Sequence, residues 1–288
     1  MLNKLVICGV GLIGGSFSLA LKAAGAVREV VGVGRSQAPL QEALRLGSID
    51  RIAADWRDAL HGADLLLLAT PVGQMPQILA ALEPELTPQT VVTDGGSTKS
   101  DVVAAARAAL GDKIAQFVPG HPIAGAEKSG ASAALADLYR GKRVVLTPLP
   151  ENSAEHLHRV QTAWQTCGAQ VSLLSAAEHD QVFAAVSHLP HLLAFALVHD
   201  FAQRPNSEQL FGFAASGFRD FTRIAGSHPE MWRDICIANR RALLAELDAY
   251  SNELMRTRVL LAEGNAAGLE AMFATARRRR EQWLNASK

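Results

Sequence analysis

One histidine lies in a sequence context that suits acid–base chemistry. His121 stands between Gly120 and Pro122, inside the segment VPGHPIAGAE at residues 118–127. Pro122 disfavours the helical conformation at the residue before it, so the backbone keeps His121 extended and aims its imidazole. Histidine is the usual general base near neutral pH, although most histidines are not catalytic. The segment alone leaves two interpretations open: a general base, or a loop that carries a surface histidine.

A glycine-rich turn near the start of the chain predicts a dinucleotide site. The pattern G-x-G-x-x-G follows an apolar strand at residues 5–8 and precedes a helical pattern. Gly9 permits a tight turn, Gly11 lets a diphosphate approach the backbone, and Gly14 lets the helix pack close to the strand. The helix N-terminus then favours the negative charge of the diphosphate. The alternative is a glycine-rich turn of an unrelated α/β protein. Further residues expected at this crevice are Leu12, Ile13, Thr70 and Pro71.

The end of the second predicted strand, at residues 29–34, bears on the choice of cofactor. An NAD site places an acid there, about 20 residues after the glycines, to bind the ribose 2′-hydroxyl. This chain has Arg35 and Ser36 instead. Because a guanidinium pairs bidentately with phosphate, the sequence favours NADP, with NAD as the second choice. A solvated arginine in a turn is the alternative.

The second half of the chain contains two groups of polar residues. Asp180, His188 and His191 lie on one long predicted helix. The histidines are interpreted as a site wall or as core residues with backbone partners, and a metal site is disfavoured because no H-E-x-x-H spacing is present. Arg219 and Arg223 are four residues apart, so both guanidiniums can face a small dianionic substrate. An equally good alternative bridges these arginines to neighbouring aspartates.

Two kinds of element surround these residues. Strands are predicted at residues 5–8, 29–34, 64–70, 90–93, 117–118, 143–147 and 170–174, with helices between them. The alternation predicts an α/β Rossmann-like doubly wound domain, residues 1–174, in which Ser97 follows a strand as a helix N-cap or as a site hydroxyl. After residue 176 only helical patterns continue, at 178–202, 208–222, 229–263 and 266–284. They predict an all-α substrate and dimerisation domain, residues 175–288.

The composition narrows the function classes. The 288 residues are 49% hydrophobic, and 28 basic residues balance 28 acidic ones. Such a balance argues against a nucleic-acid or anionic-membrane partner, and no apolar run is expected to reach the roughly 18 residues of a membrane span. Three scattered cysteines suit neither a disulfide framework nor a zinc cluster, and as buried free thiols they fit a cytoplasmic location.

Five segments in combination resemble the prephenate/arogenate (cyclohexadienyl) dehydrogenase family. They are residues 9–16, 96–99, 120–125, 187–191 and 217–225, the last followed by Met231-Trp232. The resemblance covers nearly the whole chain. It implies a Rossmann domain, a helical domain that forms a homodimer, and oxidative decarboxylation of a cyclohexadienyl acid on the route to tyrosine. No fused regulatory or chorismate mutase segment is expected.

The resemblance also implies individual roles. His121 would accept a hydrogen bond from the ring hydroxyl of the substrate, Ser97 would orient that hydroxyl and the nicotinamide, and Arg223 would bind a carboxylate. Arg219 stands where some members have lysine, and Arg35 replaces the aspartate of NAD-preferring members. The residues implied around the substrate are Arg219, His191, Asp180, Glu127 and Trp232.

The paired arginines favour the more anionic prephenate, with arogenate as a second substrate. Three alternatives stay open. One is an arogenate-specific dehydrogenase. Another is a β-hydroxyacid dehydrogenase or imine reductase, which would want a lysine on the helix at 178–202, where none is present. The third is a dinucleotide-sensing regulator without turnover, which an assay of NADPH formation from prephenate would separate from an enzyme.

Overall fold

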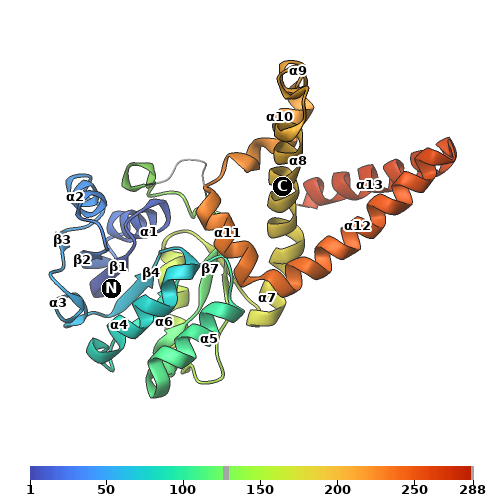
Figure 1. Ribbon diagram of the computed structural model, residues 1–288. Helices are drawn as coiled ribbons and strands as arrows, with labels where there is room; N and C mark the ends of the chain where they lie inside the picture. Colours follow the sequence, from blue (N-terminus) through green and yellow to red (C-terminus); the bar gives the residue numbers. More distant parts are fainter. Residues whose placement is uncertain (126–129, 287–288) are drawn as a thin grey trace. The chain divides into compact units, whose positions relative to one another are not determined.

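The computed structural model describes residues 1–125 and 130–286, and its centre is a six-stranded parallel sheet (Figure 1). The strand order is β3-β2-β1-β4-β5-β6, with every neighbouring pair parallel. The strands are β1 (Leu2–Cys8), β2 (Val27–Val33), β3 (Arg51–Ile52), β4 (Leu65–Leu68), β5 (Val91–Asp94) and β6 (Phe117–Val118). The order reverses between β1 and β4, so their carboxyl ends border the crevice at which open α/β sheets bind ligands.

Alternate residues of the central strands enter two separate apolar cores, one on each face of the sheet. In β1, Leu5 and Ile7 belong to one core, whereas Val6 and Cys8 belong to the other. The first face is covered by α1 (Leu12–Ala23), α2 (Gln37–Arg45) and α6 (Ala154–Thr166), and the second by α3 (Trp56–Leu60), α4 (Met75–Leu82) and α5 (Ser100–Leu110). Burial on both faces explains why residues 5–8 of β1 and all of β4 are apolar. The predicted doubly wound Rossmann-like fold is confirmed.

A second sheet, of three strands, carries His121. It consists of β7 (Gly120–Pro122), β8 (Arg143–Leu146) and β9 (Gln170–Leu173), with β7 antiparallel to β8 and β9 parallel to it. His121 stands opposite Val145. Backbone hydrogen bonds flank it on both sides, from Thr147 N–H to the Pro119 carbonyl at 2.9 Å and from Ile123 N–H to the Arg143 carbonyl at 2.8 Å. The prediction of a loop at His121 was therefore wrong.

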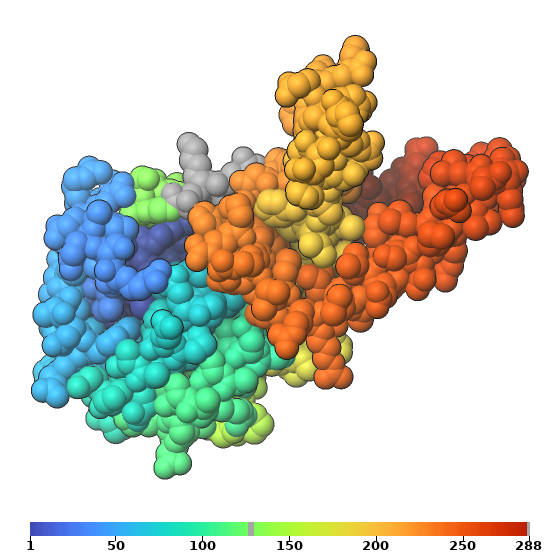
Figure 2. All heavy atoms as spheres, viewed as in Figure 1, coloured from blue at the N-terminus to red at the C-terminus, as the bar shows by residue number. Residues whose placement is uncertain are grey.

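The chain after β9 is helical in its described part, as predicted. One continuous helix runs over Ala176–Gln203, and it contains a π-helical stretch, η5 (Ala184–His188), between α7 (Ala176–Phe183) and α8 (Leu189–Gln203). Contrary to expectation, this helix is long and apolar enough to cross a membrane by length and composition, a test that core helices of soluble proteins also pass. In Figure 2, α8, α9 (Ser207–Gly212) and α10 (Ser216–Thr222) project from the sheet-containing part of the chain.

The remaining helices divide more finely than predicted. The segment at 208–222 is two short helices, α9 and α10, followed by η6 (Arg223–Gly226). The segment at 229–263 is interrupted at Asn239, between α11 (Pro229–Ala238) and α12 (Arg240–Ala262). Residues 1–240 form one compact unit, and residues 241–288 form a second. In the second unit, α13 (Ala266–Ala286) contacts α12 through the Thr257 hydroxyl and the Met272 sulfur, 3.6 Å apart.

Candidate active site

The glycine turn has the geometry that a bound diphosphate needs. Gly9 has a φ of 97°, and a Cβ at this position would lie 2.5 Å from the Ala69 carbonyl oxygen. A Cβ at Gly14 would lie 2.2 Å from the Gly9 carbonyl oxygen, so both positions exclude any side chain. A Cβ at Gly11 would meet open space, and no side chain caps the N-terminus of α1. An uncapped helix end beneath an open glycine is a suitable site for the diphosphate of a dinucleotide.

The other residues expected at the cofactor surround the same turn. Leu12 and Ile13 begin α1 and are half-buried, and the Thr70 methyl group lies close to Gly9. Pro71 is exposed at the start of η1 (Val72–Gln74). A Cβ built on Gly95 would lie 3.1 Å from Ile13 and 3.7 Å from Pro122. The cofactor turn, the turn after β5 and the His121 strand therefore converge at one edge of the sheet.

Arg35 and Ser36 lie at the end of β2. Ser36 is the N-cap residue of α2, but its hydroxyl makes no capping hydrogen bond. Arg35 is exposed and, among the described residues, has neither an ion pair nor a hydrogen bond. One anion can therefore interact with the Arg35 guanidinium, the Ser36 hydroxyl and the uncapped N-terminus of α2.

A buried ion pair joins the Ser97 turn to the His121 strand. Asp94, the last residue of β5, pairs with Lys99, and both side chains are 0% exposed. Asp94 also accepts hydrogen bonds from the N–H groups of Gly96, at 2.8 Å, and Gly120, at 3.0 Å. One carboxylate therefore fixes both segments of the site. The sequence pattern does not reveal this pair, because nothing in it indicates that a lysine is buried.

Asp180, from α7, caps helix α5. Its carboxylate accepts the N–H groups of Lys99 and Ser100, each at 2.8 Å, so the helix is capped neither by Ser97 nor by Thr98. Burial opposes the ionised form, but hydrogen bonds from His179 and Ser100 hold the pKa of Asp180 at about 2. Asp180 therefore lies next to the turn that contains Ser97, and its carboxylate is hydrogen-bonded to protein groups.

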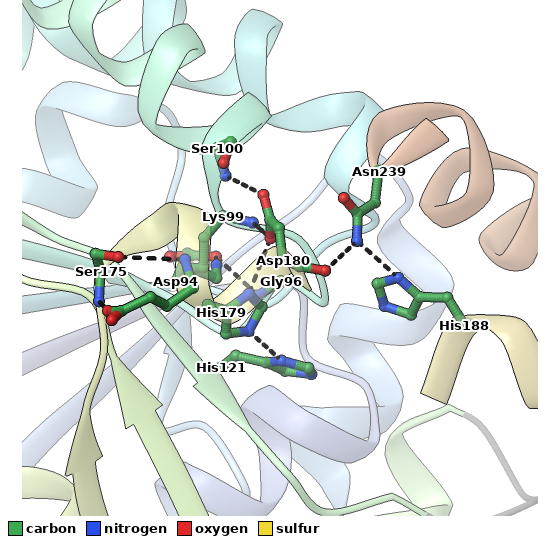
Figure 3. A network of polar contacts seen from close by, with 11 residues as sticks. Asp94, Gly96, Lys99, Ser100, His121, Ser175, His179, Asp180, His188 and Asn239 are labelled. Atoms are coloured by element: carbon green, nitrogen blue, oxygen red, sulfur yellow. Dashed lines mark hydrogen bonds and ion pairs between the residues drawn. The ribbon is translucent and has the colours of Figure 1, made fainter. Parts of the chain in front are cut away.

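A chain of hydrogen bonds leads from Asp180 to His121 (Figure 3). His179 Nδ1 lies 2.9 Å from Asp180 Oδ1, and His179 Nε2 lies 2.8 Å from His121 Nδ1. Phe183 packs against both rings, with centroid distances of 4.5 and 5.0 Å. Burial is the main cause that lowers the pKa of His121 well below 6.5, and the neighbouring His179, the Lys99 ammonium and His188 also disfavour a positive charge on this ring. His121 is therefore neutral at pH 7 and able to accept a proton.

His179 is the site residue that sequence reasoning missed. It is fully buried on α7, and burial lowers its pKa against the opposing effect of Asp180. Its partner His121 is 58 residues away along the chain. Only its position next to Asp180 could have drawn attention to it.

His188 packs on the far side of Asp180. Its Nδ1 lies 3.1 Å from the Asn239 side-chain amide, which also donates to the Asp180 carbonyl at 2.8 Å. Burial lowers the pKa of His188 to about 4, against smaller opposing effects of Asp180 and the Ser97 backbone. His188 is thus a buried neutral residue, in line with the interpretation as a core histidine.

His191, Trp232 and Arg223 form a second cluster. The imidazole of His191 stacks on the Trp232 indole, with ring centroids 3.6 Å apart and planes inclined by 18°. His191 Nδ1 donates to the Ser187 carbonyl at 2.9 Å, which leaves Nε2 as an acceptor. Burial lowers the pKa of His191, and the charge of Arg223 adds to this effect, so the guanidinium lies nearby.

Two predicted residues are not part of either cluster as the structure describes them. Arg219 is exposed on α10, and no hydrogen bond or ion pair holds it within the described part of the chain. Arg219 forms no ion pair with Asp220 or Asp234 in this part of the chain, and Asp234 binds the neighbouring Arg233 at 2.7 Å. Glu127 lies outside the described residues. In residues 1–125 and 130–286, no group of three His, Cys, Asp or Glu side chains is arranged to hold a metal.

Comparison with known proteins agrees with this geometry. Residues 17–173 match the family model of the prephenate dehydrogenase nucleotide-binding domain, and residues 175–275 match the model of the prephenate dehydrogenase dimerization domain. Prephenate dehydrogenase of Bacillus subtilis is 36% identical over 282 residues, which cover 96% of this chain and 75% of that protein. Cyclohexadienyl dehydrogenase of Zymomonas mobilis is 34% identical, over 90% of this chain and 89% of that protein.

A solved structure of similar fold is prephenate dehydrogenase of Aquifex aeolicus, in complex with hydroxyphenyl propionate and NAD⁺. It superposes with a TM-score of 0.90 at 35% identity and covers 98% of each chain. Both family models and the three relatives named here are described as prephenate or cyclohexadienyl dehydrogenases. The chain belongs to the prephenate dehydrogenase family of oxidoreductases.

Proposed function

We propose that the protein oxidatively decarboxylates prephenate with NADP as the cofactor, and that His121 is the general base. The observation that carries this proposal is a neutral His121, fixed on β7 at the sheet edge where the glycine turn also lies. A general base must be uncharged at the working pH and within reach of the proton that it takes. The pKa of His121, lowered by burial, supports the first condition, and its position on β7 beside the glycine turn supports the second.

The chemistry assigns a task to each cluster. When bound, the nicotinamide accepts a hydride from the carbinol carbon of the substrate. His121 takes the hydroxyl proton as that carbon becomes a carbonyl, and Ser97 orients the hydroxyl. The ring carboxylate then leaves as CO₂, its bonding electrons aromatise the ring, and His121 returns the proton to the phenolate oxygen. No metal is needed, because aromatisation drives the loss of CO₂.

The second cluster is suited to hold the substrate acid. Arg223 supplies a cation near His191, and Trp232 fixes the orientation of that imidazole by stacking. We assign Arg223 to a substrate carboxylate, with His191 and Trp232 as the pocket wall, and we retain Arg219 and Glu127 as proposed substrate-binding residues. A carboxylate held at a fixed distance from the nicotinamide reduces the entropic part of the barrier.

We infer that prephenate is preferred and that arogenate is at most a second substrate. The two acids differ in one group, a keto group in prephenate and an ammonium group in arogenate. An ammonium ion needs an acid or several carbonyl oxygens. Of the two candidate acids, Asp180 is already occupied by His179, Lys99 and Ser100, and Glu127 lies outside the described residues. The preference therefore rests on the positive charges of Arg219 and Arg223, which favour the more anionic acid. Comparison of kcat/KM for both acids at fixed NADP tests this inference. An arogenate preference above about tenfold, or 1.4 kcal/mol, would refute it.

NADP is proposed over NAD on the residues at the end of β2. Arg35 has no other partner among the described residues, and Ser36 leaves its hydroxyl and the α2 N-terminus open. Together they suit a 2′-phosphate, whereas the 2′-hydroxyl of NAD requires an acid that this position lacks. The Aquifex aeolicus enzyme was solved with NAD⁺, so the proposal rests on these two residues and not on that relative.

We also propose a homodimer formed through the helical domain, residues 175–288, in the cytoplasm. The match to a dimerization domain supports the assembly. So do the exposed apolar side chains of this region, which include Phe213 at 82% and Val186 at 66% exposure. Monomers rarely leave so much apolar surface in water. Two of the three free thiols, Cys8 and Cys167, are buried as predicted, while Cys236 is only half-buried.

The direct test is turnover. Purified protein with prephenate and NADP should form NADPH and CO₂ in equal amounts, and substitution of NAD should lower kcat/KM. If neither prephenate nor arogenate is oxidised with either NADP or NAD, the proposed enzyme is excluded, and a dinucleotide-sensing regulator becomes the better account.

A further inference from the structure

We infer that His179 is a positioning residue, and that the hydrogen-bonded chain Asp180–His179–His121 selects Nε2 of His121 as the atom that takes the proton. This inference rests on the proposed role of His121 and deepens it. It assigns a function to a buried histidine whose side chain has no part in binding substrate or cofactor.

The direction of each hydrogen bond follows from the donors and acceptors present. The Asp180 carboxylate can only accept, so His179 must carry its proton on Nδ1, 2.9 Å away. In a neutral imidazole the other nitrogen is then an acceptor. His179 Nε2 therefore accepts from His121 Nδ1, at 2.8 Å, and the remaining lone pair of His121 is on Nε2.

The anchor of the chain is rigid. Asp180 is held by the backbone N–H groups of Lys99 and Ser100 at the start of α5, in addition to its bond with His179. The carboxylate cannot rotate away without uncapping that helix. Asp180 is 6% exposed and His179 is 0% exposed, so water does not compete for these hydrogen bonds.

Two consequences for the reaction follow. Without His179, nothing would hold His121 in the tautomer with the proton on Nδ1, and the ring would also present an N–H group to the substrate hydroxyl. When His121 takes the proton, its Nδ1–H still donates to His179, and the ionised Asp180 stands behind that ring. The chain thus stabilises the imidazolium at the moment when it forms.

The tautomer is measured directly by two-bond ¹⁵N–¹H correlation spectra of the ¹⁵N-labelled full-length protein, at a pH above the pKa of every histidine. The His121 signals are identified by their loss in His121→Asn. In the wild-type protein, His121 should carry its proton on Nδ1, with Nε2 bare. A wild-type spectrum with the proton on Nε2 overturns the inference without the need for any variant.

Variants then test the link to catalysis. His179→Leu removes the acceptor and should mix the His121 tautomers and lower kcat by about 10-fold or more, a part of the roughly 10²-fold that a general base contributes. KM should change by less than about 3-fold, because the lost interaction acts mainly in the transition state. His179→Gln keeps an acceptor for His121 and a donor for Asp180, so it should restore most of kcat.

Phe183→Leu is the matched packing control, since Phe183 touches both rings without a hydrogen bond. It should leave the tautomer unchanged and reduce kcat much less than His179→Leu. Equal losses in the two variants would assign His179 a packing role and overturn the inference. If His179→Leu shifts the tautomer but keeps kcat, the positioning chain stands and the proposed role of His121 as the base fails.

Discussion

The buried ion pair between Asp94 and Lys99 can be tested by removal of its cation. Lys99→Met keeps the length of the side chain and leaves the Asp94 carboxylate without a counter-ion in a site that is 0% exposed. Loss of one partner of a buried pair costs about 3–5 kcal/mol. Two backbone N–H groups, of Gly96 and Gly120, still stabilise the carboxylate. We therefore expect the lower end of that range, about 3 kcal/mol.

Asp94→Asn should be more costly than Lys99→Met. The Lys99 ammonium has no partner other than Asp94 among the described residues, so it would be left buried and unpaired. We expect a loss of about 4–5 kcal/mol. In the double variant neither position 94 nor position 99 carries a charge. Its loss of unfolding free energy should therefore be at least about 2 kcal/mol smaller than the sum of the two single losses.

Guanidinium chloride unfolding, followed by both fluorescence and circular dichroism, measures these free energies where the two transitions coincide. A loss of unfolding free energy below about 1 kcal/mol in Lys99→Met would contradict the role of this ion pair. So would a loss in the double variant that equals the sum of the two single losses within about 0.5 kcal/mol. A second readout comes from the site. Because the Lys99 charge contributes to the lowered pKa of His121, its removal should move the acid limb of kcat/KM to higher pH.

Three further predictions follow from the same structure. Arg35→Asp should invert the preference of kcat/KM from NADP to NAD, since phosphate pairing is replaced by repulsion; a wild-type enzyme that prefers NAD would refute the assignment. The contribution of His188 to the free energy of unfolding should be fully present above pH 6.5 and fall as the pH approaches 4. In this range His188 is protonated in the unfolded chain, whereas folded His188, with a pKa of about 4, stays neutral. The difference between the unfolded and folded pKa values corresponds to roughly 3 kcal/mol. A free energy of unfolding, measured in urea, that is the same at about pH 7 and pH 4.5 would contradict this prediction. In sedimentation at micromolar concentration the protein should be a dimer, and a monomer there would exclude the proposed interface.

Local patterns in the sequence were sufficient for the Rossmann-like domain. The strand, glycine turn and helix around Gly11 occupy consecutive residues, so their order alone indicates the geometry that the structure has. Residues 5–8 of β1 and all of β4 are apolar because both faces of the sheet are covered. An all-apolar run of this kind can be recognised as a buried strand in the sequence without knowing which strands pair with it.

The errors occurred where the structure depends on tertiary packing and not on the local pattern. Strand β7 has three residues, too few for any periodicity, and it pairs with β8 more than 20 residues later. The Asp94–Lys99 pair was invisible because burial depends on the packed tertiary structure. His179 meets His121 only through the fold. The segment at 208–222 kept a helical pattern in sequence, although the chain breaks it between α9 and α10.

The most direct test of the account is the kcat of His121→Asn with prephenate and NADP. Asparagine can keep a hydrogen bond to His179, but it cannot take a proton at neutral pH, so binding and chemistry are separated. We predict a kcat lower by roughly 10²-fold or more, with an unchanged affinity for NADP in a fluorescence titration. A variant that turns over at the wild-type rate would contradict the assignment of His121 as the base.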